Sequence, residues 1–249
     1  MGSAFKRLER NTGGRDFVVG DLHGMFSALE RAMDELGFDR HQDRMISVGD
    51  LIDRGPESHR ALEFLEQPWF FAVQGNHERL LLESEVDRDL ATSWVTLNGG
   101  EWWMDVDPIT QDRFRRRLRA LPFALEADTE PGQVGIVHAD VPPRLNWMAF
   151  LEQLERDQRT REYATWSRKR IGQVLKDEAI TPVEGLALLV VGHTPVQEAM
   201  RRENIYYLDT GAAYGKQMPH AKLSILQIHP QWALNSFPTA SRPTSQGST

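Results

Sequence analysis

The sequence predicts an α/β fold in which helices cover a sheet and a polar site lies at the ends of the strands. Short apolar runs of strand length alternate with segments in which apolar residues recur at helical spacing. Several of these runs are followed directly by Gly, Asp, Asn or His. Such alternation is typical of a sheet covered on both faces, and sites in these sheets gather where the strands end and the loops begin.

Seven strands are expected, each a short run rich in apolar residues. They are residues 17–21, 45–50, 69–76, 134–140, 186–194, 205–212 and 223–229. Helices are expected after the first three strands. Their helical spacing is seen at Phe26, Leu29, Met33 and Leu36, at Ala61, Leu62 and Leu65, and in HERLLLESE from His77 onward.

A single domain is expected at residues 1–234, followed by a tail at residues 235–249. Residues 85–130 have a mostly helical pattern. Residues 141–183 are polar and irregular, which is typical of a cap or an insertion between strands. Residues 235–249, NSFPTASRPTSQGST, are rich in Ser, Thr and Pro, and this composition predicts a disordered tail.

Composition and charge restrict the function. The formal net charge of −7 argues against a nucleic-acid-binding module, because such modules need a basic surface. The chain has no cysteine, so a bound metal must be held by His, Asp, Glu, Asn or water. Residues 1–16 lack the apolar core of a signal peptide, and no apolar stretch has membrane-spanning length. These features favour a cytoplasmic enzyme without membrane or nucleic-acid partners.

Side chains that bind metals follow five of the expected strands. They are Asp21 and His23, then Asp50, then Asn76 and His77, then His138, and finally His193. Any one of these strand ends is explained well enough by a capping aspartate or a histidine at the edge of the core. Five of them in one chain are much harder to explain as caps. Because hard divalent cations prefer carboxylate, imidazole and carbonyl ligands, we interpret the set as a two-metal site.

The spacing of these residues suggests how they share two cations. Asp21 and His23 are expected to hold the first cation together, because residues i and i+2 of an extended strand point to the same side. Asp50 is the natural bridge, since a shared carboxylate offsets the repulsion between cations about 3.5–4 Å apart. A water between them would lose a proton near neutral pH and become the nucleophile. The second cation would be completed by Asn76, His138 and His193.

The motifs at these strand ends resemble those of a known family. GDLHG (20–24), GDLIDRG (49–55), GNHE (75–78), HAD (138–140) and GHT (192–194) are similar to the motifs of the metallophosphoesterase superfamily. More narrowly, the chain resembles the phosphoprotein phosphatase branch and its bacteriophage lambda-type serine/threonine phosphatases, from about residue 15 to 229. The resemblance implies a two-sheet β-sandwich flanked by helices, with the active site at the carboxyl ends of the strands.

The resemblance also implies a role for each matching residue. His77 matches the general acid that protonates the leaving oxygen, and Asp53 matches its carboxylate partner, which should raise the pKa of His77. Arginines bind phosphate oxygens with a planar, permanently charged fork. The expected phosphate-binding residues are Arg54, Arg168 and Asn76. The metal ligands implied are the same six as above: Asp21, His23, Asp50, Asn76, His138 and His193.

The expected function is hydrolysis of phosphoserine or phosphothreonine in proteins, with phosphotyrosine as a further candidate substrate. The expected cofactors are two divalent metal ions, Mn²⁺ first, with Fe, Zn, Ni and Co as other candidates. One alternative is a diadenosine tetraphosphate hydrolase, which has almost the same metal motifs. Glu78 and the WSR element at 166–168 favour the phosphatase. A second alternative is an inactive relative that only binds phosphoproteins, but every metal and acid position is present.

Several other polar and aromatic residues are expected to have only structural roles. The seven tryptophans are expected mainly in the core. Glu78 is expected to support the helix that follows it. Asp140 and Asp209 either orient ligand histidines or cap strand ends. The histidines outside the motifs are expected on the surface: His41, His59, His220 and His229.

Overall fold

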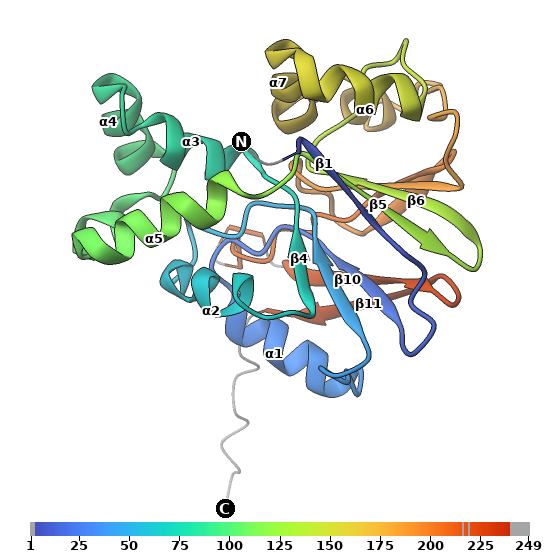
Figure 1. The fold of residues 1–249 in the computed structure, drawn as a ribbon, viewed down its shortest axis with the longest axis horizontal. Helices are drawn as coiled ribbons and strands as arrows, with labels where there is room; N and C mark the ends of the chain where they lie inside the picture. The colour runs from blue at the N-terminus through green and yellow to red at the C-terminus, as the bar shows by residue number, and fades with distance from the viewer. Residues whose placement is uncertain (1–2, 216, 219, 240–249) are drawn as a thin grey trace, which may run out of the picture.

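The computed structural model describes residues 3–215, 217–218 and 220–239, and in this part of the chain two β-sheets lie between layers of helices (Figure 1). The first sheet has six strands, in the order β1 (Phe5–Leu8), β5 (Ala124–Thr129), β6 (Gly132–Val137), β7 (Leu188–Val191), β9 (Ile205–Tyr207) and β8 (Met200–Arg202). The second has five, in the order β11 (Ala233–Pro238), β10 (Lys222–His229), β2 (Asp16–Val19), β3 (Arg44–Ser47) and β4 (Phe70–Ala72).

Each sheet contains a block of three neighbouring parallel strands. β2, β3 and β4 run parallel in the five-stranded sheet, and β6, β7 and β9 run parallel in the six-stranded sheet. Antiparallel strands flank them, with β10 paired to β2 and β5 paired to β6. Because parallel strands end at the same edge, the loops after β2, β3 and β4 are brought together, as are those after β6 and β7.

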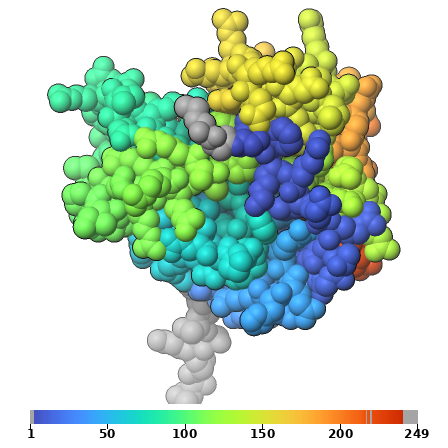
Figure 2. Space-filling view, in the orientation of Figure 1, coloured from blue at the N-terminus to red at the C-terminus, as the bar shows by residue number. Residues whose placement is uncertain are grey.

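Helices cover the outer face of each sheet. The five-stranded sheet is covered by α1 (Phe26–Glu35), η1 (Ser58–Arg60) and α2 (Ala61–Leu65), and the six-stranded sheet by α6 (Trp147–Arg156), α7 (Gln158–Trp166) and α8 (Lys169–Val174). A further group of helices lies to one side: α3 (Asn76–Glu83), α4 (Arg88–Leu97), η2 (Glu101–Asp105) and α5 (Pro108–Arg119). Figure 2 shows the α3–α5 segment (teal to green) and the α6–α7 segment (yellow) as neighbouring lobes of the surface.

Alternate side chains of the central strands build different parts of the core. In β2, Val18 faces the core between the sheets, whereas Phe17 and Val19 face the helices of the outer layer. In β7, Leu188 and Val190 lie between the sheets, and the residues that alternate with them pack under α6–α8. Strands buried on both faces have this continuous apolar character, which explains why they were recognisable as short apolar runs.

Several features of the fold differ from the sequence-based expectations. Residues 141–183, expected to be irregular, contain α6, α7 and α8, which bury an apolar stripe that includes Trp147 and Phe150. Residues 85–130 are helical as expected except for strand β5 at their end. β11 runs to Pro238, so the predicted tail begins at least four residues too early; residues 240–249 lie outside the described part.

One surface prediction is also wrong. His229, expected on the surface, is only 6% exposed, and its Nδ1 accepts a hydrogen bond of 3.1 Å from the backbone N–H of Glu130. His41, His59 and His220 are exposed as expected. Among the described helices, none has the length and apolar character needed to cross a bilayer.

Candidate metal centre

The loops after five parallel strands bring the six predicted metal ligands and the predicted general acid, His77, to one buried place. The loops after β2, β3 and β4 come from the five-stranded sheet, and those after β6 and β7 come from the six-stranded sheet. Each side chain is at most 5% exposed, although each is polar or ionisable. Polar groups are rarely buried in such numbers unless they serve a site. The residues are Asp21, His23, Asp50, Asn76, His77, His138 and His193.

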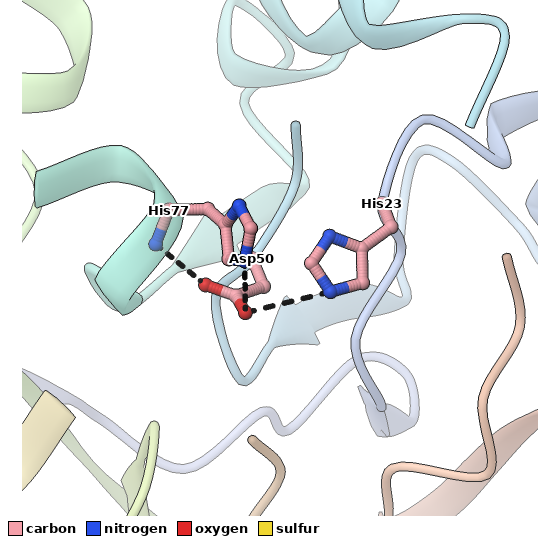
Figure 3. A group of neighbouring side chains, drawn as sticks. All are labelled: His23, Asp50 and His77. Carbon is pink, nitrogen blue, oxygen red and sulfur yellow. Dashed lines mark hydrogen bonds and ion pairs between the residues drawn. The ribbon is translucent and has the colours of Figure 1, made fainter. Parts of the chain in front are cut away.

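Asp50 lies at the middle of this cluster. Its Oδ2 is 3.5 Å from His23 Nε2 and 4.0 Å from His77 Nε2, and its Oδ1 is 3.4 Å from His138 Nε2. Figure 3 shows the imidazoles of His23 and His77 on two sides of this carboxylate. Two groups of three possible ligand atoms, each within 4.8 Å of one another, share Asp50: His23, Asp50 and His77, and Asp50, His138 and His193.

Backbone carbonyls orient two of the histidines toward Asp50. His23 Nδ1 lies 2.9 Å from the carbonyl oxygen of Ile52, and His138 Nδ1 lies 2.8 Å from that of Val48. A carbonyl only accepts, so each Nδ1 carries the proton and each Nε2 keeps its lone pair. Burial lowers the pKa of both histidines and keeps them neutral. A neutral imidazole held in this way is the form that binds metals.

Acceptor atoms converge around His138. Its Nε2 is 2.9 Å from the amide oxygen of Asn76 and 3.2 Å from His193 Nδ1. Burial, together with the nearby His138, lowers the pKa of His193 to about 3, so that this ring is neutral as well. Asn76 Oδ1 and the unprotonated His138 Nε2 face each other with lone pairs, which repel, and a cation between them removes the repulsion. The donor set of this group therefore fits a divalent cation.

Asp21 lies beside this centre but outside both groups of three. Both of its carboxylate oxygens accept a hydrogen bond of 3.1 Å from the backbone N–H of His193. Burial raises its pKa well above the usual value, and the negative charges of Asp209 and Asp50 raise it further. A cation stabilises buried carboxylates that repel one another, so this part of the site is also suited to bind a cation.

The geometric reason given for pairing Asp21 with His23 is wrong. His23 has φ of 42°, so the chain turns at this point instead of continuing as an extended strand. Non-glycine residues rarely adopt positive φ, and such residues concentrate at functional sites. Seven non-glycine residues have positive φ in the described part of the chain, and five of them belong to this centre: His23, Asp50, Asp53, Arg54 and His193.

His77 is paired with Asp53, as the sequence predicts. Its Nδ1 donates to Asp53 Oδ2 at 2.7 Å, while its Nε2 is buried without a hydrogen-bond partner. Burial alone would lower the pKa of His77, but Asp50 and the hydrogen-bonded Asp53 outweigh it and raise this pKa. The raised pKa favours the imidazolium form, in which the Nε2 proton would face the centre in the position of a proton donor.

The two predicted arginines lie at the rim. Arg54 Nη1 is 2.5 Å from His23 Nε2, and its guanidinium stacks over the Tyr214 ring at 5.2 Å. Arg168 is exposed at the start of α8, and its charge contributes to the low pKa of His193. The Trp166 ring, two residues before Arg168, lies 6.1 Å from the His193 ring, which places this turn next to the centre.

Glu78 supports the helix that follows it, as expected, and it also holds the loop that carries Asp50. Its Oε2 accepts from the backbone N–H groups of Gly75 at 2.8 Å and Asp50 at 2.9 Å, and its Oε1 accepts from Leu51 N–H at 2.8 Å. The carboxylate therefore caps α3 and at the same time fixes the loop that carries Asp50.

The sequence left open the roles of two acidic residues, and it missed two aromatic ones. Asp140 forms an ion pair with the buried Arg170, and Asp209 lies beside Asp21 and accepts from Gly211 N–H at 2.9 Å. The two aromatic residues are Trp94 and Trp102, whose indole N–H groups both donate to Asp53. A sequence signal for this segment is the glycine pair between them, in NGGEWW (98–103).

Comparison with known proteins agrees with the motifs and the geometry. The chain is 35% identical over 223 residues to serine/threonine-protein phosphatase 1 of Salmonella typhimurium. The aligned region covers 88% of this chain and 96% of that protein. It is 26% identical over 220 residues to an asymmetrical bis(5'-nucleosyl)-tetraphosphatase of Anoxybacillus flavithermus, covering 81% of this chain and 87% of that protein. A protein serine/threonine phosphatase structure from Saccharomyces cerevisiae shares the fold, with a TM-score of 0.67 at 13% identity and coverage of 98% and 86% of the two chains.

A family model covers the whole candidate centre. Residues 17–223 match the model of the calcineurin-like phosphoesterases, and this range includes the two sheets' central strands and every ligand residue named above. The resemblance inferred from the strand-end motifs is thereby confirmed. The chain belongs to the calcineurin-like phosphoesterase family.

Proposed function

We propose that the centre around Asp50 binds two divalent cations and hydrolyses phosphoserine and phosphothreonine in proteins. The observation that carries the proposal is the position of Asp50, whose carboxylate lies next to His23, His77 and His138, with His77 hydrogen-bonded to Asp53. The protein is a hydrolase of the phosphoprotein phosphatase type, in line with bacterial relatives named serine/threonine-protein phosphatase at 35%, 31% and 33% identity.

Six residues would hold the cations. Asp21 and His23 belong to the first, and Asp50 belongs to both. The donor set is made of carboxylate, imidazole and amide oxygen, which suits Mn²⁺ and leaves Fe, Zn, Ni and Co as other candidates. Bound there, the cations would supply a water acidic enough to attack phosphorus near neutral pH. The ligands proposed for the second cation are Asp50, Asn76, His138 and His193.

The protein's own side chains would perform the proton transfer. Serine is a poor leaving group as an alkoxide, and the Nε2 proton of His77 faces the centre, where it can protonate the leaving oxygen. Asp53 holds Nδ1 of the same ring and so fixes both the tautomer and the orientation of His77. No covalent phosphoenzyme is required, in agreement with the absence of cysteine from the chain.

Arginines would bind the phosphate. Arg54 lies at the rim of the centre and lines an open pocket of about 880 Å³, together with Trp102, Glu101 and Asp105, which offers room for the substrate chain. In the structure its guanidinium contacts the His23 lone pair that a cation would use, so cation binding would release Arg54 for phosphate oxygens. Arg168, on the turn beside His193, would bind from the opposite side, and Asn76 would contribute its amide.

A dinucleoside tetraphosphate hydrolase is the alternative function, favoured by the similarity to the tetraphosphatase of Anoxybacillus flavithermus at 26% identity. That identity is lower than the 35% shared with the phosphatase of Salmonella typhimurium. Glu78 and the turn that carries Arg168 are the features that favour the phosphatase. Activity on phosphotyrosine and a cytoplasmic location remain predictions of the sequence.

The function is tested by assaying purified protein, loaded with Mn²⁺, against a phosphoserine peptide, a phosphotyrosine peptide and diadenosine tetraphosphate. Elemental analysis of the same sample should find two metal equivalents per chain. The phosphoserine peptide should be the best substrate, and Asp50→Asn, which removes the shared ligand, should abolish its turnover. Fast cleavage of the dinucleotide with negligible turnover of both peptides would establish the alternative instead.

A further inference from the structure

We propose that Trp94 and Trp102 are positioning residues for the general acid: their indole N–H groups hold the Asp53 carboxylate in the one orientation that aligns His77. The inference rests on the proposed function, because it assigns these residues to the proton transfer by His77. The two residues belong to the α4–η2 segment. Trp94 lies 41 positions and Trp102 lies 49 positions after Asp53 along the chain.

Three donors surround the Asp53 carboxylate. Oδ2 accepts from Trp94 Nε1 at 2.6 Å and from His77 Nδ1 at 2.7 Å, and Oδ1 accepts from Trp102 Nε1 at 2.7 Å. An indole N–H can only donate, so the direction of both bonds is unambiguous. Asp53 is fully buried, and its carboxylate cannot rotate without breaking at least one of these bonds.

The choice of indole has a chemical consequence. A lysine or arginine in the same place would pair with the carboxylate charge and compete with the imidazolium for it. An indole N–H is neutral, so it restrains the carboxylate while leaving the full negative charge to His77. Two neutral donors on one buried carboxylate are therefore suited to positioning, and an ordinary buried salt bridge is not.

The backbone of the α4–η2 turn is shaped to deliver both tryptophans. Gly99 has φ of 82°, its carbonyl accepts from Arg54 N–H at 3.3 Å, and a Cβ there would lie 2.5 Å from the Arg54 nitrogen. A Cβ at Gly100 would lie 2.5 Å from the Trp94 ring. Gly99 thus allows the turn to pack directly against the loop of Asp53 and Arg54, and Gly100 allows it to pack against the Trp94 ring.

The same tryptophans also belong to an aromatic cluster, so packing must be separated from hydrogen bonding. Trp94 and Trp102 contact Trp103 at ring distances of 6.0 and 5.3 Å, and Trp102 contacts Phe114 at 5.3 Å. Tryptophan to phenylalanine keeps an aromatic ring in the cluster and removes the N–H. Trp103 provides a matched control, because in the described structure its indole does not donate to Asp53.

The experiment compares Trp94→Phe, Trp102→Phe and Trp103→Phe in the metal-loaded enzyme on two substrates. One is the phosphoserine peptide, whose leaving oxygen needs a proton, and the other is 4-nitrophenyl phosphate, whose leaving group does not. Trp94→Phe and Trp102→Phe should lower kcat for the peptide about 10-fold or more, and kcat for the aryl phosphate about twofold or less. Trp103→Phe should affect both substrates alike. Trp102 is only partly buried, so its variant remains informative if Trp94→Phe fails to fold.

Two outcomes would overturn the inference, and they are distinguishable with His77→Asn. If His77→Asn shows the difference between the substrates but the Trp94 and Trp102 variants behave like Trp103→Phe, the tryptophans are only packing residues. If His77→Asn itself shows no difference between the substrates, the general-acid role fails, and the inference fails with it. Metal content measured on every variant excludes loss of the cations as the cause.

Discussion

At the scale of single residues, unfavourable backbone conformations are concentrated where the chemistry is proposed. His23, Asp50, Asp53, Arg54 and His193 all have positive φ. Each such conformation in a non-glycine residue costs on the order of 1–3 kcal/mol. The surrounding contacts offset this cost: Glu78 holds the backbone N–H of Asp50, and the Ser58 hydroxyl accepts from the backbone N–H of Asp53 at 2.8 Å.

His77 carries the sharpest prediction at this scale. His77→Asn should keep both metals but lower turnover of the phosphoserine peptide roughly 10²–10⁴-fold, because asparagine cannot donate the proton that the leaving alkoxide needs. Steady-state kinetics together with elemental analysis measure both parts. Unchanged peptide turnover would show that His77 is not the general acid.

The pH dependence follows from the same group. A general acid must be protonated, so peptide turnover should be present below the pKa of His77 and lost as the pH rises through it. Asp50 and Asp53 raise this pKa above its usual value of about 6.5, which moves the loss to higher pH. The alkaline limb of the kcat profile should be absent from His77→Asn, and its persistence there would assign the limb to another group.

At the scale of elements, a buried ion pair connects α8 to the loop after β6. Arg170 is 3% exposed, pairs with the Asp140 carboxylate and donates to the Val141 carbonyl at 3.1 Å. Asp140 comes two residues after His138, and Arg170 comes two residues after Arg168. The pair thus joins a proposed ligand loop to the turn that carries a proposed phosphate-binding arginine.

Replacing Arg170 should destabilise the protein. Burial raises the pKa of Asp140 to about 6 even with Arg170 beside it, so its charge is costly to bury. Arg170→Met leaves that charge unpaired and should lower the free energy of unfolding by about 3–5 kcal/mol. Urea denaturation measures the change. The exposed neighbour provides a control, since Lys169→Met should change stability by less than about 0.5 kcal/mol. A similar small effect of Arg170→Met would contradict the role assigned to the pair.

At the scale of the whole molecule, the candidate centre joins the two sheets. Asp21, His23 and Asp50 follow strands of the five-stranded sheet, whereas His138 and His193 follow strands of the six-stranded sheet. Cations held by both sets would bind the folded chain and not the unfolded one. Their binding free energy would therefore add to the stability of the fold.

Metal removal should accordingly lower the melting temperature. A cation present at 100 times its Kd contributes about 2.7 kcal/mol, which corresponds to roughly 5–10 °C for a chain of this size. Calorimetry before and after treatment with a chelator, followed by addition of Mn²⁺, measures the effect and its reversal. Asp50→Asn should be insensitive to both treatments, and equal responses of the two proteins would indicate that the metal binds elsewhere.

Much of the fold was predictable because the central strands are buried on both faces. Such strands are continuous apolar runs, as in Phe17–Val19 and Leu188–Val191, and are visible in sequence. β1 and β5 were missed because FKRL and ALEADT contain charged residues and lie toward one edge of the six-stranded sheet. Their strand conformation depends on pairing with each other, which local sequence does not encode.

The sequence by itself predicted the proposed donor set of this protein, which is the carboxylates, imidazoles and amide that follow its parallel strands, and through the family resemblance it also predicted the His77–Asp53 pair. Side-chain chemistry and the position of a residue after a strand are local properties, so they are legible without coordinates. Only the tertiary structure decided that His23 turns at positive φ and that the α4–η2 segment brings two indoles to Asp53. These depend on packing between distant segments, and the spacing of residues in a chain does not specify which loops meet.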